Sequence, residues 1–306
     1  MRMRRHDVIE GETGMAKMTN QTELQRVALV TGANTGIGRV TARELAKQGM
    51  HVFVACRSRE RTQELFDEIK ALAPSATVEW LALDLASFES IRQCAETFLA
   101  RGLPLHLLIN NAGLAGAKGL TQEGFELAFG VNHVGHFLLT QLLLERIKRS
   151  APARIVTVAS RAHYRAPGID WQAVRERTRS VSAVAEYSVS KLANVLFSAE
   201  LARRLAGSGV STYSLHPGVV ASDVWRSLPW PLRSLIKLFL ISTEQGAATT
   251  LYCATSAAVA GESGLYYDSC RSRNPSKVAR DPELAALLWK NSEDWVRPPD
   301  YLPNAR

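Results

Sequence analysis

The clearest structural signal in this chain is the stretch Val27-Ala28-Leu29-Val30-Thr31-Gly32-Ala33-Asn34-Thr35-Gly36-Ile37-Gly38. It begins as a short β-rich apolar run, three glycines follow, and a helical pattern continues over 40–48. This order predicts a strand, a tight turn and a helix, in which the glycines let the backbone approach a pyrophosphate at the helix N-terminus. The spacing is GxxxGxG rather than GxGxxG, and an ordinary βα turn is the alternative.

The rest of the chain repeats this alternation of strand and helix. Short apolar, β-rich runs lie at 27–30, 52–55, 78–83, 105–109, 154–158 and 210–215, and helical patterns lie at 36–48, 60–72, 88–100, 132–149, 185–206 and 243–257. The alternation predicts an α/β fold, a single Rossmann-type doubly wound parallel sheet with helices on both faces. A nucleotide would then bind at the carboxyl ends of the strands, where the strand order switches.

The length of 306 residues fits one enzyme domain. We expect that domain over 26–297, after a disordered extension over 1–25 and before a C-terminal tail over 298–306. A further helix is expected at 281–295, beside the site. No run of 18 apolar residues and no signal-peptide pattern is found, so no membrane-spanning helix is expected.

The composition excludes several kinds of site. Four cysteines show no metal-type or CxxC spacing, which predicts a reducing cytoplasm, no structural disulfides and no metal. The net charge of +8 attracts polyanions, but no nucleic-acid binding motif accompanies it. Attraction of a phosphorylated cofactor or of an anionic membrane surface explains the charge equally well.

Three side chains are suited to proton transfer at a carbonyl. Tyr187 and Lys191 lie four residues apart on a predicted helix, and Ser160 ends an apolar run upstream. The Lys191 ammonium would favour the Tyr187 phenolate and lower its pKa from about 10 toward the working pH. A tyrosine tuned in this way acts as a general acid or base, although a YxxxK pair alone is often a surface pair.

The end of the second predicted strand indicates which cofactor would bind. Arg57 and Ser58 stand where an acidic residue would contact the ribose 2′-hydroxyl of NAD. A guanidinium binds a 2′-phosphate in a bidentate manner, so Arg57 favours NADP(H), and a solvated loop arginine is the alternative.

With these motifs in their order, the chain resembles the short-chain dehydrogenase/reductase family over about 27–296. The family motifs present are Asp84-Leu85, Asn110-Asn111-Ala112-Gly113, Asn132 and His216-Pro217-Gly218, besides the glycine turn and the Tyr/Lys pair. Stretches such as Lys191-Leu192-Ala193-Asn194-Val195-Leu196-Phe197 are similar to the retinol dehydrogenase group, whose members typically handle hydrophobic alcohols and aldehydes with NADP(H).

The resemblance implies a role for each matching residue. Ser160 would bind the carbonyl oxygen, Tyr187 would donate its proton, Lys191 would hold the nicotinamide ribose, and Asn132 would extend the proton path through water. For Asn132, satisfying a helix distortion is a compatible second role. Asp84 would bind adenine, with a helix N-cap as the alternative. The implied cofactor-binding set is Gly32, Asn34, Thr35, Gly36, Ile37, Gly38, Arg57, Ser58, Asp84, Leu85, Asn111, Ala112, Gly113, Tyr187, Lys191, Pro217, Gly218, Val220 and Ser222.

The chain departs from the family pattern at three points. Ala159 precedes Ser160 where a second serine is common, and Ser222 stands where a threonine often contacts the carboxamide. Ser160 and Tyr187 are 27 residues apart, about twice the usual spacing, with a basic helix-like run at 175–179 between them. We expect this insertion to form a surface flap beside the substrate site.

The segment 225–241 is amphipathic and bears on the substrate. It carries Trp225 and Trp230, which we assign to substrate binding, with Arg233 and Lys237 on the opposite helical face. Three interpretations remain open: a lid over an apolar substrate, an interfacial helix in peripheral contact with a membrane, and packing against the core or a partner subunit.

These features together predict a cytoplasmic NADP(H)-dependent oxidoreductase. It would interconvert a hydrophobic aldehyde or ketone, retinal-like or otherwise lipophilic, and its alcohol by hydride transfer. A steroid or other polycyclic carbonyl is an alternative substrate, and a non-catalytic NADP(H)-binding regulator is the alternative from another class. The helices at 132–149 and 186–205 could pair in a homo-oligomer or face their own sheet.

Overall fold

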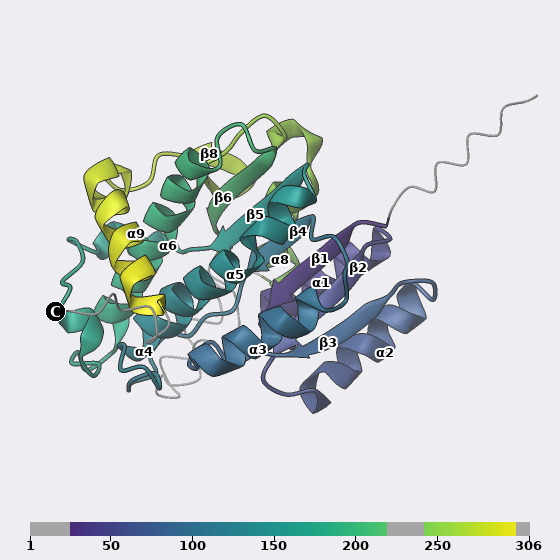
Figure 1. Ribbon diagram of the computed structural model, residues 1–306, viewed down its shortest axis with the longest axis horizontal. Coiled ribbons are helices and arrows are strands. Elements are labelled where there is room, and N and C mark those ends of the chain that lie inside the picture. Colours follow the sequence, from purple (N-terminus) through teal and green to yellow (C-terminus); the bar gives the residue numbers. More distant parts are fainter. Residues whose placement is uncertain (1–24, 219–241, 298–306) are drawn as a thin grey trace, which may run out of the picture.

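The computed structural model describes residues 25–218 and 242–297 (Figure 1). The expected extension and tail therefore lie outside the described residues, apart from Gln25. So do Val220, Ser222, Trp225, Trp230 and the rest of 225–241.

The strands are β1 (Val27–Thr31), β2 (His51–Cys56), β3 (Val78–Ala82), β4 (Leu107–Asn110), β5 (Ala153–Val158), β6 (Val210–His216), β7 (Leu265–Asp268) and β8 (Arg271–Arg273). The α-helices are α1 (Gly36–Lys47), α2 (Gln63–Leu72), α3 (Phe88–Leu99), α4 (Leu127–Phe129), α5 (Gly135–Arg149), α6 (Val184–Arg204), α8 (Thr243–Thr255) and α9 (Pro282–Val296).

The strands form one sheet in the order β3-β2-β1-β4-β5-β6-β7-β8. All neighbouring pairs are parallel except β7 and β8, which are antiparallel. The six predicted strands and the parallel sheet are confirmed, whereas β7 and β8 were not predicted. The order reverses between β1 and β4, so the glycine turn after β1 lies at the switch point.

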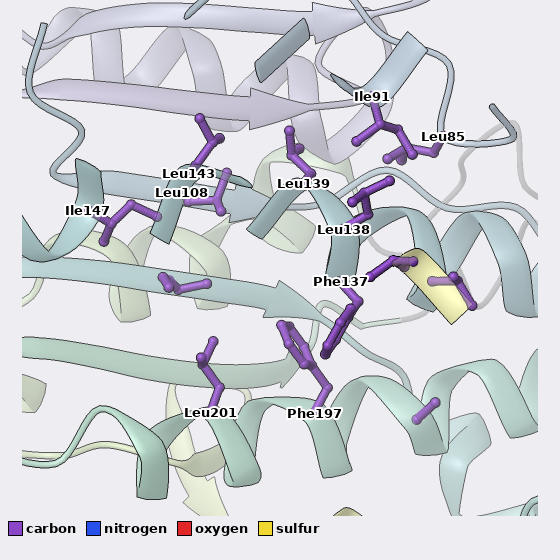
Figure 2. Packing of buried hydrophobic residues seen from close by; sticks show 14 of the residues in the cluster. Leu85, Ile91, Leu108, Phe137, Leu138, Leu139, Leu143, Ile147, Phe197 and Leu201 are labelled. Carbon is purple, nitrogen blue, oxygen red and sulfur yellow. The ribbon is translucent and has the colours of Figure 1, made fainter. Parts of the chain in front are cut away.

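Helices cover both faces of the sheet, as predicted (Figure 1). Because the strands are buried on both sides, two apolar clusters form. One joins the sheet to α1, α2 and α8, and the other joins it to α3, α5, α6 and α9. Figure 2 shows part of the second cluster, where Phe137 of α5 lies against Phe197 of α6 with ring centroids 5.7 Å apart.

The helix predicted at 132–149 has a distorted start. A π-helical segment, Gly130–Val134, separates α4 from α5. Among the described residues, the stretch Leu127–Arg149 is long and apolar enough to cross a membrane by composition, but 72% of its apolar window is buried inside the protein. It therefore packs as the core helix that Figure 2 shows in part.

The insertion between β5 and α6, hereafter the inserted segment (residues 161–183), lies largely at the surface, and its place beside the substrate site stays a prediction. The short 3₁₀ helices Arg161–Arg165 and Ala173–Arg175 are its regular elements, and the helix-like run predicted at 175–179 is wrong because the backbone becomes extended at Glu176. Val174 and Ala183 are buried. The helix predicted at 281–295 is confirmed as α9, which packs beside α6 (Figure 1).

Candidate active site

The glycine turn packs against the loop that follows β4. Gly32 has a φ of +65°, and a Cβ there would lie 2.8 Å from the Ala112 Cα. A Cβ on Gly38 would lie 2.4 Å from the Asn111 Nδ2 and 2.5 Å from the Gly32 carbonyl oxygen. These two glycines are therefore required by the close approach of two loops, and Gly36, with a φ of +57°, is required by the turn itself.

The N-terminus of α1 leaves backbone donors free. Its N-cap residue Thr35 is exposed and makes no side-chain capping bond, and no acidic residue lies in the first turn. Asn34 and Ile37 are half-buried on either side. An uncapped helix N-terminus of this kind fits the diphosphate of a dinucleotide.

The ends of β2 and β3 carry the other predicted nucleotide contacts. Arg57 is exposed and makes no ion pair within the described ranges, and the Ser58 Oγ accepts a bond from the Arg61 N–H at 3.4 Å. The Asp84 Oδ1 accepts a bond from the Ala86 N–H at 3.0 Å. The alternative N-cap role of Asp84 is wrong, because Ser87 caps α3. Leu85 is buried beside Asp84.

A hydroxyl and an imidazole, neither of them predicted, join these loops to the catalytic region. The Thr31 Oγ1 accepts bonds from the backbone N–H groups of Asn111 and Ala112, both at 2.9 Å, and lies 2.9 Å from the His136 Nε2. The His136 Nδ1 lies 3.0 Å from the Asn132 carbonyl oxygen, which can only accept. His136 therefore donates through Nδ1 and accepts the Thr31 proton at Nε2.

Burial keeps this imidazole neutral. His136 is 1% exposed, and burial lowers its pKa to about 4, although its bond to the Asn132 backbone opposes the shift. The sequence contained no signal for this bridge, because the Thr31 and His136 side chains come from β1 and α5.

Asn132 lies within the π-helical segment, and its amide is fully engaged. Its Oδ1 accepts a bond from the Leu114 N–H at 2.9 Å, and its Nδ2 donates to the Leu114 carbonyl oxygen at 3.1 Å and to the Ser190 Oγ at 2.9 Å. A Cβ on Gly113 would lie 3.3 Å from the Asn132 Oδ1 and 3.4 Å from the Lys191 Nζ. The predicted helix distortion is confirmed, and the water path stays a prediction.

Ser160, Tyr187 and Lys191 meet at the carboxyl end of β5. The Lys191 Nζ donates to the Val158 carbonyl oxygen at 2.8 Å and lies 5.7 Å from the centre of the Tyr187 ring. The Ser160 Oγ accepts a bond from the Ala162 N–H at 3.1 Å, and Ser160 is close enough to Tyr187 to influence the pKa of the phenol. Ser160 and Tyr187 are half-buried, whereas Lys191 is 3% exposed.

The electrostatics of this trio differ from the expectation. Burial raises the pKa of the Tyr187 phenol, and the nearby Ser160 hydroxyl only reduces the rise. Burial also lowers the pKa of Lys191 to about 7. The predicted lowering of the Tyr187 pKa is therefore wrong for this structure, because desolvation of the buried phenol is the largest influence on its pKa.

The last described residues at the carboxyl edge of the sheet follow β6. Pro217 and Gly218 are half-buried, and Gly218 has a φ of +94°. A doubly wound sheet with a phenol, a hydroxyl and an ammonium at its carboxyl edge, beside an uncapped glycine turn, defines the class of Rossmann-type oxidoreductases.

Comparison with known proteins identifies the family. The model of the short chain dehydrogenase family matches residues 26–230, and the chain belongs to this family. Mouse retinol dehydrogenase 12 is 47% identical over 270 residues, which cover 87% of this chain and 85% of that protein. The chain is thus an oxidoreductase of the retinol dehydrogenase-like kind.

Solved structures agree with this assignment. A crystal structure of an uncharacterized protein from Mycobacterium paratuberculosis is similar, with a TM-score of 0.69 and 34% identity over 89% of this chain and 93% of that chain. The RhlG/NADP complex from Pseudomonas aeruginosa has a TM-score of 0.62 and 26% identity, and covers 79% of this chain and 93% of that chain.

Proposed function

We propose that the protein is an NADP(H)-dependent oxidoreductase that interconverts a small lipophilic aldehyde or ketone and its alcohol. The observation that carries the proposal is the meeting of Ser160, Tyr187 and Lys191 at the sheet edge that also holds the α1 N-terminus. The names of its relatives, retinol dehydrogenase and an NADP complex, support the substrate class and the cofactor.

The described residues fit the cofactor along its length. The free N–H groups of α1 suit the diphosphate, Asp84 has a second carboxylate oxygen for adenine, and exposed Arg57 suits a 2′-phosphate. The loop Asn111-Ala112-Gly113 passes beside Lys191, which would hold the nicotinamide ribose. When bound, NADP(H) would supply or accept the hydride.

The proton chemistry would belong to this chain's own residues. Ser160 would donate a hydrogen bond to the substrate oxygen, and Tyr187 would give that oxygen a proton as negative charge develops there. Because burial raises the pKa of Tyr187, the phenol is protonated at neutral pH, which suits reduction of a carbonyl. Lys191, with a pKa of about 7, can exist in both charge states and would steady the phenolate afterwards.

Exposed apolar side chains close to Tyr187 in the sequence favour a lipophilic substrate. Val181 is 91% exposed and Val184 is 38% exposed, and both lie within six residues of Tyr187. A cytoplasmic location, which suits the four free cysteines, remains part of the proposal.

The test is NADPH consumption with medium-chain, aromatic, polyene and steroid carbonyls, repeated with NADH. We expect turnover on lipophilic members with NADPH.

Arg57→Ala should raise the KM for NADPH by about 10- to 100-fold and leave that for NADH unchanged, because a charge-assisted bidentate contact is lost. Arg149→Ala is the control, since it removes an equal charge at the exposed C-terminal end of α5. Equal use of NADH, or an unaltered Arg57→Ala enzyme, would contradict the cofactor assignment.

A further inference from the structure

The chain reverses direction just before α6, and one carboxylate holds this reversal. The Glu186 Oε1 accepts bonds from the backbone N–H groups of Arg179 at 3.0 Å and Ser180 at 2.8 Å. The Ser180 hydroxyl donates to the Glu186 Oε2. A side chain in the first turn of α6 therefore satisfies backbone donors six and seven residues earlier in the chain.

The helix starts from a backbone conformation that needs such support. Ala183 is fully buried and has a φ of +54°, in the left-handed region that a residue with a Cβ rarely adopts. Its carbonyl oxygen accepts a bond from the Tyr187 N–H at 3.2 Å. The bond from the Tyr187 N–H thus depends on the position of Ala183. The position of Ala183 in turn depends on the reversal that Glu186 stabilises.

A second carboxylate fixes the other side of the inserted segment. The buried Glu126 accepts a bond from the Thr178 hydroxyl at 2.5 Å and from the Phe129 N–H at 2.8 Å. The Gly119 N–H donates to the Thr178 Oγ1 at 3.1 Å, and the Glu126 N–H donates to the Val174 carbonyl oxygen at 2.9 Å. Residues 174–178 are therefore fastened to α4, and the stretch from there to α6 relies on Glu186.

The other bonds from backbone N–H groups in this stretch are longer than those of Glu186: the Ala183 N–H donates to the Ser180 carbonyl oxygen and the Val184 N–H donates to the Ser182 Oγ, both at 3.4 Å. No helix or strand forms over 176–183, so this backbone has no ladder of its own. The Arg179 guanidinium pairs with Glu176, which connects two side chains of the segment but holds no backbone group. Burial acts to raise the pKa of Glu186, but the hydrogen bonds from Ser180 outweigh it and the pKa is lowered, so the carboxylate is charged at neutral pH.

We infer that Glu186 is a positioning residue, whose carboxylate clamps the reversal at 179–183 and thereby sets Tyr187 against Ser160. The inserted segment connects Ser160 directly to α6. If this segment becomes more mobile, the Tyr187 phenol can therefore move away from the Ser160 hydroxyl, with which it must act. A displacement near 1 Å at a reacting group costs about 100-fold in rate. The catalytic part of this inference rests on the proposed function, and the conformational part does not.

The test compares Glu186→Ala with Glu176→Ala. The control removes a carboxylate from the same segment, where it binds the side chains of Arg179 and Gln172 and no described backbone N–H group is bonded to it. Trypsin reports on the clamp, because Arg177 and Arg179 are exposed cleavage sites on either side of Thr178. Steady-state kinetics and NADPH fluorescence titration report on Tyr187 and on cofactor binding, and retained NADPH binding shows that the variant has folded.

For Glu186→Ala we expect cleavage after Arg177 and Arg179 to become faster by about 10- to 100-fold, because hydrogen bonds to a charged group are lost. We expect kcat to fall by a similar factor, with an unchanged Kd for NADPH. Glu186→Gln, which keeps one accepting oxygen, should be intermediate in both respects, and Glu176→Ala should match the wild type.

Two results would overturn the inference. Wild-type cleavage rates in Glu186→Ala would show that no clamp exists, even if no substrate were ever turned over. Faster cleavage with an unaltered kcat would show that the clamp does not position Tyr187. Absence of turnover in the wild type, by contrast, would count against the proposed function while the cleavage rates still decided the clamp.

Discussion

Two regions flank Tyr187 and are held in place in different ways. In the glycine-turn region (residues 31–38 and 111–114), loops approach so closely that a Cβ cannot fit, and backbone N–H groups bond to one hydroxyl. In the inserted segment, two carboxylates, Glu126 and Glu186, bind a chain without regular structure. The first region depends on close backbone packing around one side chain, Thr31, and the second depends on carboxylates that bind an irregular chain.

This difference suggests that one region serves cofactor binding and the other serves substrate binding. Backbone packing leaves little freedom, which suits a site for a cofactor of invariant shape. Side-chain anchors can be exchanged without rebuilding the sheet, which suits a region that adapts to a substrate. Substitutions in the two regions should therefore separate cofactor binding from turnover.

The largest expected effect is that of a methyl group in the glycine-turn region. Gly38→Ala places a Cβ 2.5 Å from the Gly32 carbonyl oxygen and should lower the free energy of unfolding by about 3 kcal/mol, with loss of NADPH binding. Gly168→Ala in the inserted segment meets no atom within 4 Å and should change it by less than about 0.5 kcal/mol. Urea unfolding of both variants checks the contrast, and equal stabilities would refute it.

Acid should affect the two regions in opposite directions. His136 has a folded pKa of about 4 against 6.5 when unfolded, so its contribution to stability is present above pH 6.5 and is lost as the pH falls toward 4. Burial raises the pKa of Glu126, so its contribution is present at low pH and is lost as the pH rises through its folded pKa.

Urea unfolding at pH 7 and pH 4.5 measures this difference. The loss of unfolding free energy on acidification should shrink by about 2 kcal/mol in His136→Gln and should grow in Glu126→Gln. Other buried histidines, such as His133, contribute to the wild type and the variants alike. A change of the same sign in both variants would show that the two regions do not differ in this way.

A smaller effect should come from removing one hydroxyl in each region. Thr31→Val leaves the Asn111 and Ala112 N–H groups and His136 without their partner, and should weaken NADPH binding by about tenfold. Thr178→Val releases Glu126 and should lower kcat/KM by a similar factor with an unchanged Kd for NADPH. Fluorescence titration beside steady-state kinetics separates the two, and weaker NADPH binding in Thr178→Val would count against independent regions.

The parts of the fold that local sequence encodes were predicted. Apolar runs gave six strands, and the turn Gly32-Ala33-Asn34-Thr35-Gly36-Ile37-Gly38 marked the switch point, because both signals lie within a dozen residues. Strand β7 is only four residues long, and β8 is the polar Arg271-Ser272-Arg273 without alternation, so neither produced a pattern.

The contacts that hold the site were harder to predict because they join distant positions. Glu126 and Thr178 are 52 residues apart, and Thr31 and His136 are 105 apart. An isolated Glu or His in the sequence is usually a solvated or core residue, and only the folded chain shows its partner. The raised pKa of Tyr187 was missed for the same reason, since burial is a property of the tertiary structure.

The role of Tyr187 as the proton donor of an NADPH-dependent enzyme is tested by measuring NADPH binding and turnover of a polyene or medium-chain aldehyde in the wild type and in Tyr187→Phe. We expect the wild type to consume NADPH, and the variant to bind NADPH with the same Kd while its kcat falls by about 1,000-fold or more, because the proton donor is absent. Tight NADPH binding by the wild type without turnover of any carbonyl or alcohol, or an active Tyr187→Phe variant, would contradict the account.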